Sequence, residues 1–424
     1  MKDKSWTRRR FLHTGMSAGM TAAVVARGLE AAAYARVADA NERIRIGQIG
    51  CGGRNRWHTQ WVKNVAEQAN ATVMAACDVW KQQVESMVSH IKRRFEGDVK
   101  TFTDYRKMLE DKDIDALIIA TPDHQHCGQL IDAVKAGKDV YIEKPIAMEM
   151  DELNRACDVV KASKCVVQHG TQGRSTPGRA ACSALYKSGT MGKLFRVEST
   201  ETAYTPYWNY YACPASEADT DWKAFLYNRA DRPFDADQHG CWMGYHDFSS
   251  GPIGGWMSHF SDFVHGVTGC GFPLAAVAHG GIFAPTTDKR RTAPDTVTVV
   301  VEYAEGFVTH FTTHFGSAVD NETTTYFFEK GTLRTAFGHS PGDCVVSGEG
   351  SDHPERPREK KSLEQPATQD HMLNWLECIR TRKQPAAHMD AGYKQGVAVV
   401  LGDLAYVAGK KMVFDPAKRE IRPA

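Results

Sequence analysis

A glycine-rich turn near residue 50 is the first pattern in the chain that could do chemistry. Residues 50–55 read G-C-G-G-R-N, between a short apolar run and a segment with helical periodicity. In such a G-x-G-x-x-N turn, Gly50 permits a tight strand-to-helix connection and Gly52 lets the backbone approach a pyrophosphate. The N-terminus of the following helix offers unsatisfied N–H groups to the anion. The pattern predicts a dinucleotide site that includes Gly53 and Arg54.

Two further residues refine this site. Asn55 stands where a third Gly or Ala is usual, so it either loosens the helix packing or lends its amide to the phosphates. Asp78 ends the next apolar run. A carboxylate there accepts the ribose hydroxyls of NAD and repels the 2′-phosphate of NADP, which favours NAD. Two alternatives stay open: Lys81 or Arg54 binds a phosphate, or Asp78 only caps a helix.

These residues need helices and strands to position them. In the first half of the chain, short apolar runs alternate with segments of helical periodicity. Strands that alternate with helices at this spacing predict βαβ units and a parallel sheet. The predicted strands cover residues 44–49, 72–77, 115–120, 139–142 and 165–168, and the predicted helices cover residues 54–67, 80–95, 126–136 and 151–161.

The rhythm changes after about residue 190. Long runs over residues 194–202, 295–303, 307–315 and 324–329 predict strands, several of them alternating in polarity. That alternation is typical of an open sheet with one covered face. Between them, residues 204–269 are rich in Trp, Tyr and Gly with little periodicity, and a long irregular segment inside a domain is usually functional. Helices are predicted over residues 369–381 and 391–410.

Motifs at two strand ends resemble a known family. Residues 121–126 read T-P-D-H-Q-H and residues 143–145 read E-K-P. With the glycine turn, they resemble the glucose–fructose oxidoreductase, inositol dehydrogenase and rhizopine-catabolism family (Gfo/Idh/MocA). The resemblance continues through G-T-Q at residues 170–172 and G-P-I-G-G-W at residues 251–256 to the helix that ends near Arg380.

The resemblance implies an α/β fold of two domains. A Rossmann domain over residues 41–168, with a parallel sheet, is followed by an α/β domain over residues 169–424. The second domain is expected to hold a large, open, mostly antiparallel sheet that commonly serves for assembly into a homodimer or homotetramer. Its last helices can pack back on the Rossmann domain.

The resemblance also implies roles around the nicotinamide. Thr121 and Pro122 would line it, His126 would open a helix beneath it, and Glu143 would lie at the neighbouring strand tip. Lys144 would place an ammonium group beside it, able to hold a substrate hydroxyl and stabilise the alkoxide. The Lys144–Pro145 peptide is expected to be cis. The alternative is a surface lysine at a turn.

His259 matches the family's catalytic histidine, which takes the hydroxyl proton near neutral pH. The family often has an acid four residues earlier, where this chain has Gly255. Asp262 would share a helical face with His259 and could orient its imidazole instead. The alternative is a hydrogen-bonded core histidine.

Three more residues are candidates for contact with substrate. Gln172 and Arg174 would reach the cleft from the domain junction, although Arg174 could equally be a structural ion-pair partner. Trp242 belongs to a set of flat aromatic side chains that suit the C–H faces of sugars, or that simply form a core under a long loop. The spacing of His residues supports no metal site.

Composition excludes several function classes. The chain has 424 residues, 52 basic and 51 acidic, for a net charge of +1. That balance provides no overall basic field for nucleic acid. The 11 cysteines are scattered without a C-x-x-C pair, which argues against a disulfide framework or a thiolate zinc site. Most are expected to be small buried apolar side chains.

The N-terminus resembles an export signal. Residues 7–12 read T-R-R-R-F-L, and a small-residue apolar stretch and an A-x-A site follow. Residues 1–35 are therefore predicted to be a twin-arginine signal peptide, read by the twin-arginine export machinery. The folded protein is expected in the periplasm. No other segment is long and apolar enough for stable membrane insertion.

Together these features predict an oxidoreductase that uses NAD(P). It would move a hydride between nicotinamide and a hydroxyl of a sugar, cyclitol or glycoside. Because an exported protein lacks a nicotinamide pool, tightly bound NAD is expected. Two alternatives stay open: a redox-neutral glycosidase that works through a transient 3-keto sugar, and a non-catalytic sugar-binding protein.

Overall fold

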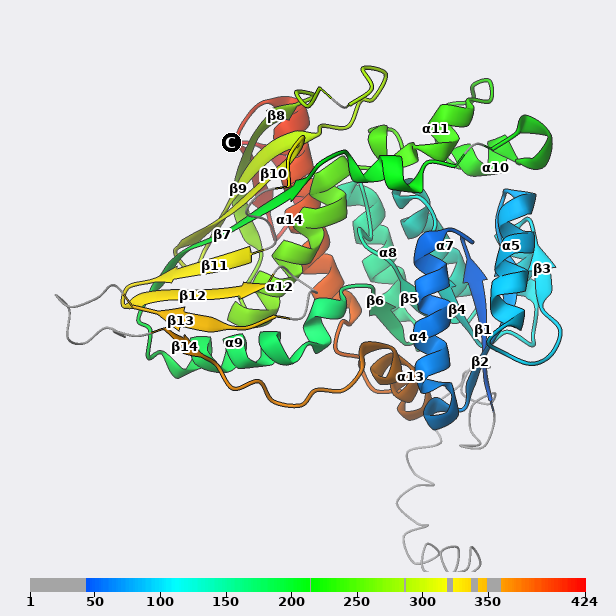
Figure 1. The fold of residues 1–424 in the computed structure, drawn as a ribbon, viewed down its shortest axis with the longest axis horizontal. Helices are drawn as coiled ribbons and strands as arrows, with labels where there is room; N and C mark the ends of the chain where they lie inside the picture. The colour runs from blue at the N-terminus through cyan, green and yellow to red at the C-terminus, as the bar shows by residue number, and fades with distance from the viewer. Residues whose placement is uncertain (1–42, 214, 286, 319–322, 337–341, 349–359) are drawn as a thin grey trace, which may run out of the picture.

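The chain folds into two α/β layers that stand side by side (Figure 1). The computed structural model describes residues 43–424 except 214, 286, 319–322, 337–341 and 349–359. The predicted export signal over residues 1–35 lies outside the described residues.

The first layer, within residues 43–171, is a parallel sheet of six strands in the order β3-β2-β1-β4-β5-β6. Strand β4 reads A-L-I-I and is buried at every position, as expected where helices cover both faces of a parallel sheet. The strand order reverses between β1 and β4, and ligands of open α/β sheets bind at such a point. The strands are β1 (Ile44–Ile49), β2 (Ala71–Cys77), β3 (Lys100–Phe102), β4 (Ala116–Ile119), β5 (Asp139–Ile142) and β6 (Val167–His169), and the helices are α4 (Gly53–Ala69), α5 (Lys81–Lys92), α6 (Tyr105–Glu110), α7 (His126–Lys135) and α8 (Met150–Ala162).

The second layer is a mixed sheet, which among the described residues has ten strands in the order β14-β13-β12-β11-β7-β10-β9-β8-β15-β16. The central pair β7 and β10 is parallel, and the other pairs are antiparallel. The strands are β7 (Leu194–Ala203), β8 (Pro273–Gly281), β9 (Thr296–Tyr303), β10 (Phe307–Phe315), β11 (Thr323–Phe328), β12 (Gly331–Ala336), β13 (Val345–Ser347), β14 (Lys361–Ser362), β15 (Met412–Asp415) and β16 (Glu420–Pro423). The fold class expected from the sequence is confirmed.

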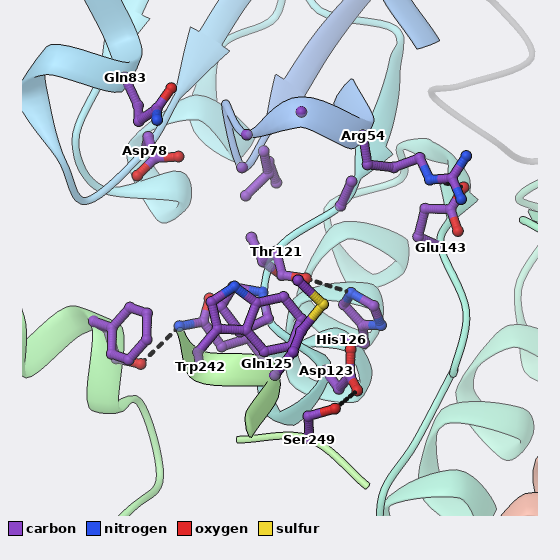
Figure 2. Close-up of a pocket in the computed structure, with 18 of the residues that line it drawn as sticks. Arg54, Asp78, Gln83, Thr121, Asp123, Gln125, His126, Glu143, Trp242 and Ser249 are labelled. Atoms are coloured by element: carbon purple, nitrogen blue, oxygen red, sulfur yellow. Dashed lines mark hydrogen bonds and ion pairs between the residues drawn. The ribbon is translucent and has the colours of Figure 1, made fainter. Parts of the chain in front are cut away.

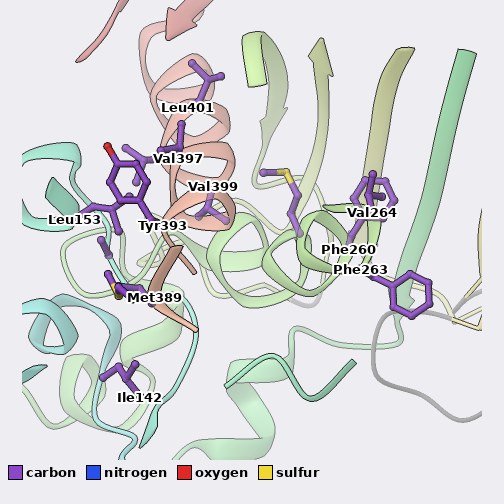
Figure 3. Close-up of a cluster of buried hydrophobic side chains, with 14 of the residues drawn as sticks. Ile142, Leu153, Phe260, Phe263, Val264, Met389, Tyr393, Val397, Val399 and Leu401 are labelled. Carbon is purple, nitrogen blue, oxygen red and sulfur yellow. The ribbon is translucent and has the colours of Figure 1, made fainter. Parts of the chain in front are cut away.

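Helices join the two layers through one apolar core (Figure 3). Helix α14 (Met389–Ala408) lies between α8 of the first layer and α12 (Ser258–Thr268) of the second. Helix α9 (Pro177–Ser188) also belongs to the second layer and packs on α12. Gly396 of α14 has no room for a side chain, because a Cβ there would lie 2.8 Å from Leu153 of α8. Helix α13 (His371–Thr381) returns to the first layer, where Arg380 donates to the carbonyl of Ala69 at 2.8 Å.

Helix α12 corrects the expectation that residues 204–269 lack regular structure. Nearly every side chain from Ser258 to Val267 is buried. Its polar residues, among them His259 and Asp262, are buried together with its apolar ones, so polarity does not separate a buried from an exposed side of this helix.

The rest of that segment forms a strap, which we define as residues 204–250 without 214. It carries α10 (Trp222–Leu226) and α11 (Ala236–Gly240) and crosses the end of the first layer beside α5 and α7 (Figure 1). The backbone N–H of Asp221 donates to the carbonyl of Val79 at 2.9 Å, and Gln125 Nε2 donates to the carbonyl of Phe225 at 2.7 Å. The strap is therefore anchored to the first layer at two places.

Two kinds of feature are absent from the part of the chain that the structure describes. None of the helices in this part of the chain is both long and apolar enough to cross a bilayer. No group of three or more His, Cys, Asp or Glu residues is arranged there to hold a metal ion.

Candidate active site

A pocket of about 900 Å³ opens at the carboxyl ends of β1, β2, β4 and β5. Its floor is the first layer, and the strap and the start of α12 cover it. Figure 2 shows Asp78 and Gln83 on one side of the pocket and Arg54 and Glu143 on the other. Twelve of the predicted residues line it: Gly50, Gly52, Gly53, Arg54, Asp78, Thr121, Pro122, His126, Glu143, Lys144, Trp242 and His259.

The glycine turn has the geometry that a dinucleotide needs. Gly50 has φ +85°, and a Cβ there would lie 2.5 Å from the carbonyl oxygen of Ala120, so only glycine fits. A Cβ on Gly52 would meet no atom within 4 Å, so the space above it is open. No side chain caps the N-terminus of α4. The chain thus presents backbone N–H groups to an anion, which fits the pyrophosphate of a dinucleotide.

The side chain of Asn55 points away from the expected phosphate position. Its side-chain Nδ2 donates to the carbonyl oxygens of Ile49 at 3.0 Å and Gly50 at 2.5 Å, and it is fully buried. Gln48 Nε2 donates to Asn55 Oδ1 at 3.2 Å. The Asn55 amide therefore holds the glycine turn from beneath, and its N–H groups are not directed at a phosphate.

Asp78 lies at the end of β2, on the pocket wall. Its carboxylate accepts hydrogen bonds from the backbone N–H of Cys51 at 2.6 Å and of Trp80, the residue before α5, at 2.9 Å. Burial raises the pKa of Asp78. Each oxygen keeps a second lone pair, so Asp78 can brace the turn and still accept a ribose hydroxyl.

Glu143 anchors a buried polar network beside the pocket. His58 Nε2 lies 2.9 Å and Arg54 Nε 3.6 Å from Glu143 Oε1, and Gln172 Nε2 donates to the same oxygen at 3.2 Å. Although burial opposes ionisation, the neighbouring Arg54 and His58 hold the pKa of Glu143 well below its usual value. Glu143 is therefore a buried anion beside Lys144.

Lys144 points into the junction of the two layers. The Lys144–Pro145 peptide is cis, as expected. Lys144 Nζ donates to the carbonyl oxygen of Gly255 at 2.8 Å, which joins β5 to the segment before α12. Burial and the charge of Arg54 lower the pKa of Lys144, while Glu143 and Asp123 oppose that change. An ammonium group thus lies in the pocket and not in bulk solvent.

Asp123 is a pocket residue that sequence reasoning overlooked, although it lies within the T-P-D-H-Q-H motif. It is buried, lines the pocket, and accepts a hydrogen bond from Ser249 Oγ at 2.7 Å (Figure 2). Burial raises the pKa of Asp123 to about 7, with Lys144 opposing and Glu143 reinforcing the shift. A carboxyl group that exchanges its proton near neutral pH suits acid–base work.

The hydroxyl of Tyr207 occupies the space beside residue 255. A Cβ on Gly255 would lie 2.6 Å from the Tyr207 hydroxyl. The Tyr207 ring stacks on Trp256 at 5.4 Å between centroids and lines the pocket. The sequence indicated Tyr207 only as one aromatic of many. The space next to Lys144 that a carboxylate side chain would fill holds a phenol.

His259 and Asp262 have different surroundings in the structure. His259, at the start of α12, lines the pocket, whereas Asp262 accepts a hydrogen bond from Arg174 Nε at 2.7 Å. Asp262 and Arg174 do not line the pocket, and neither does Gln172, which donates to Tyr141 Oη at 2.6 Å. Arg174 thus forms an ion pair with Asp262, which is the structural alternative left open for it, and Gln172 bonds to residues of the first layer.

His126 ties the two strand-end motifs together. Its Nδ1 lies 2.7 Å from the carbonyl oxygen of Pro145, and its Nε2 lies 2.9 Å from that of Thr121. The imidazole thus lies between the segment after β4 and the segment after β5, where Pro145 is next to Lys144 in the chain.

Comparison with known proteins supports a cofactor site here. Residues 44–171 match the model of the Gfo/Idh/MocA oxidoreductase family, NAD-binding Rossmann fold. The scyllo-inositol 2-dehydrogenase (NAD⁺) of Bacillus subtilis is 28% identical over 151 residues, 36% of this chain and 42% of the relative. An α-N-acetylgalactosaminidase of Shewanella oneidensis is 29% identical over 174 residues, 37% of each chain. The chain therefore matches less than half the length of these curated relatives.

Solved structures extend the similarity of fold to most of the chain. Levoglucosan dehydrogenase in complex with NADH and levoglucosan superposes with a TM-score of 0.67 at 18% identity, over 90% of this chain and 99% of that one. WlbA dehydrogenase of Bordetella pertussis, in complex with NADH and UDP-GlcNAcA, gives a TM-score of 0.65 at 17% identity, over 88% and 99%. Residues 44–171 thus resemble the NAD-binding Rossmann domain of this oxidoreductase family, and the two layers together share the fold of these solved structures.

Proposed function

We propose that this protein is an NAD-dependent oxidoreductase of the Gfo/Idh/MocA type that acts on a hydroxyl of a sugar, cyclitol or glycoside. The observation that carries the proposal is the half-buried Lys144 ammonium, in the same pocket as an open glycine turn. Bound there, NAD would accept a hydride from the carbon that bears the hydroxyl. Asp78 favours NAD over NADP, because a second phosphate on the ribose would face a carboxylate.

The chain's own residues can manage the proton of such a hydroxyl. Lys144 would bind the hydroxyl oxygen and stabilise the negative charge that grows as its proton leaves. Asp123 and His259 line the same pocket and are the two candidate acceptors of that proton. Trp242, Tyr207 and Trp256 would supply flat apolar surfaces to the sugar ring.

The strap supports a further part of the proposal, that the cofactor stays bound between turnovers. Several strap residues line the pocket, among them Trp242 and Cys213, whose sulfur lies 3.9 Å from Gln83 Nε2. A dinucleotide seated below would leave only if the strap moved. A cofactor that stays bound suits the proposed export through the twin-arginine machinery to the periplasm.

Retention can be measured directly. We expect mass spectrometry of the purified, denatured protein to recover about one NAD(H) per chain. Trp222→Ala is expected to reduce that yield, because Trp222 stacks on Phe225 at 5.0 Å within the strap but does not line the pocket. Lys223→Ala, at an exposed neighbouring position, is the matched control. Protein that carries no nicotinamide at all would contradict tight binding.

Similarity to an α-N-acetylgalactosaminidase favours a second candidate function. A redox-neutral glycosidase would oxidise its sugar transiently at C3, lose the aglycone by elimination, add water and return the hydride to the sugar. The same pocket would serve, because Lys144 and Asp123 assist loss and return of the hydroxyl proton. A third candidate, a non-catalytic sugar-binding protein, would use the pocket without turnover.

One experiment separates the three functions. The purified protein is incubated with a panel of sugars, cyclitols and aryl glycosides while reduced-nicotinamide absorbance and aglycone release are followed together. A dehydrogenase accumulates reduced cofactor. A redox-neutral glycosidase releases aglycone without accumulation, and a binding protein does neither while still changing its melting temperature with ligand.

The second layer also suggests assembly. Its sheet exposes large apolar side chains, including Phe195 on β7 at 50% and Val277 on β8 at 44%. Exposed apolar surface on a sheet commonly marks a protein interface. We propose that the protein assembles into a homodimer or homotetramer through this sheet.

A further inference from the structure

Two buried cysteines lie in contact outside the pocket. Cys182 is on α9 and Cys344 directly precedes β13, and their sulfur atoms are 3.3 Å apart. Both side chains are fully buried. All 11 cysteines are described and are free thiols in this structure. This pair is the one place where the fold brings two described cysteine sulfurs within hydrogen-bonding distance.

The surroundings hold the two sulfurs together. Cys344 Sγ also lies 3.4 Å from the carbonyl oxygen of Gly178 and 3.5 Å from Thr335 Oγ1. A Cβ on Gly178 would lie 3.1 Å from Cys344 Sγ, so the small residue at 178 lets α9 approach the sheet closely. A disulfide has an S–S distance of about 2.05 Å, so bond formation needs an approach of only about 1.3 Å.

We propose that Cys182 and Cys344 form a disulfide when the protein meets an oxidising environment, and that the bond ties α9 to the edge of the ten-stranded sheet. The oxidant is a donor disulfide. The Cys344 thiolate attacks one donor sulfur, forms a mixed disulfide and expels the first donor thiolate. Cys182 then loses its proton, attacks Cys344 Sγ and expels the second donor thiolate. Two protein thiols are oxidised and one donor disulfide is reduced.

The local chemistry suits this exchange. The hydrogen bond from Cys182 lowers the pKa of Cys344, and a thiolate is the attacking species in exchange. Strand β13 has three residues, and its outer neighbour β14 has two. So short an edge has few hydrogen bonds to break, and local opening there gives a donor access to Cys344.

The bond would stabilise the second layer without changing the chemistry of the pocket. It joins residues 162 apart in sequence, and the entropy removed from the unfolded chain grows with the length of the closed loop. Helix α9 packs on α12, which carries His259, so the bond supports the pocket only at a distance. We therefore expect oxidation to raise the melting temperature and to leave turnover within about twofold.

Thiol counting tests the proposal on the full protein. Samples equilibrated in buffers of reduced and oxidised glutathione are quenched with acid, unfolded, labelled with N-ethylmaleimide and digested. The expected result is loss of two labelled thiols from the 11 in oxidising buffer, with a peptide that joins Cys182 to Cys344. The melting temperature of the oxidised protein should be higher by about 5 °C.

Single variants complete the design. Cys182→Ala and Cys344→Ala should each keep all ten remaining thiols labelled and lose the difference in melting temperature between the two buffers. Cys157→Ala, a buried cysteine on α8 without a sulfur neighbour, should behave like the parent. Full labelling of the parent in every buffer would overturn the proposal, as would a disulfide between any other pair.

Discussion

Replacing Lys144 by Met is expected to lower kcat/KM by about 10³-fold while the cofactor stays bound. Methionine keeps the length and much of the apolar volume of the lysine stem but removes the ammonium group. That group is half-buried and donates to the carbonyl oxygen of Gly255 at 2.8 Å. The variant would then have no ammonium group at residue 144 to stabilise the proposed alkoxide. Turnover and recovered NAD(H) are measured on the same preparation.

The control is Lys135→Met, at an exposed position on α7. It should retain both turnover and cofactor. If Lys144→Met turned over at the parental rate, Lys144 would have no part in the reaction. Loss of NAD(H) together with turnover would instead assign Lys144 to cofactor binding.

Replacing Asp123 by Asn is expected to lower kcat/KM for alcohol oxidation by about 10²-fold above pH 7. In the parent, the carboxyl group of Asp123 has a pKa raised to about 7, so activity should rise through that pH as Asp123 loses its proton. Asparagine cannot accept the proton, so the variant should lack this rise. The measurement is kcat/KM from pH 5 to pH 9.

The same substitution should stabilise the fold at high pH. The carboxyl group has a pKa near 3.8 in the unfolded chain and about 7 in the fold, so the fold holds a proton that the unfolded chain releases. The resulting penalty is absent below pH 3.8, grows between those values and is complete above pH 7. It amounts to at most about 4 kcal/mol. Asp123→Asn should therefore melt several degrees above the parent at pH 8.5, and the difference should shrink steadily as the pH falls toward 4.

Ser249→Ala distinguishes a titrating Asp123 from a merely structural one. Ser249 donates to the ionised carboxylate, so its removal should move the rise in activity to higher pH. The charged groups that face Asp123 are Lys144 and Glu143, and both remain in this variant. Asp98→Asn, at an exposed position, is the matched control. An unchanged pH profile in both pocket variants would remove Asp123 from the proton path.

Several site residues could be predicted because their signals are local. The backbone at Gly50 must adopt positive φ within a strand-to-helix turn, and such a requirement selects glycine whatever the rest of the chain does. The run that became β4 is apolar at every position, and those of β1 and β5 are apolar at every buried position except Gln48 and Asp139, which is typical of parallel strands. Asp78 and Lys144 were predicted because they lie within two residues of the ends of such strands.

Other elements escaped prediction because their signals are weak or mixed. Strands of two or three residues, such as β13 and β14, are too short to show alternation. Helix α12 buries polar residues such as His259 and Asp262 beside apolar ones, so polarity does not mark its buried side. Asn55 could point up to a phosphate or down to a carbonyl, and only its buried neighbours decide in favour of the carbonyls.

By itself the sequence determined the two-layer α/β fold, the glycine turn, and a lysine at the tip of a central strand, because each depends on residues adjacent along the chain. Only the tertiary structure decided which groups share the pocket. Asp123 meets Ser249 across 126 residues, and Lys144 meets the carbonyl of Gly255 across 111. Such pairs form when separate segments are buried against each other, and burial also raises the pKa of Asp123, so neither the pairs nor that shift leaves a trace in local residue order.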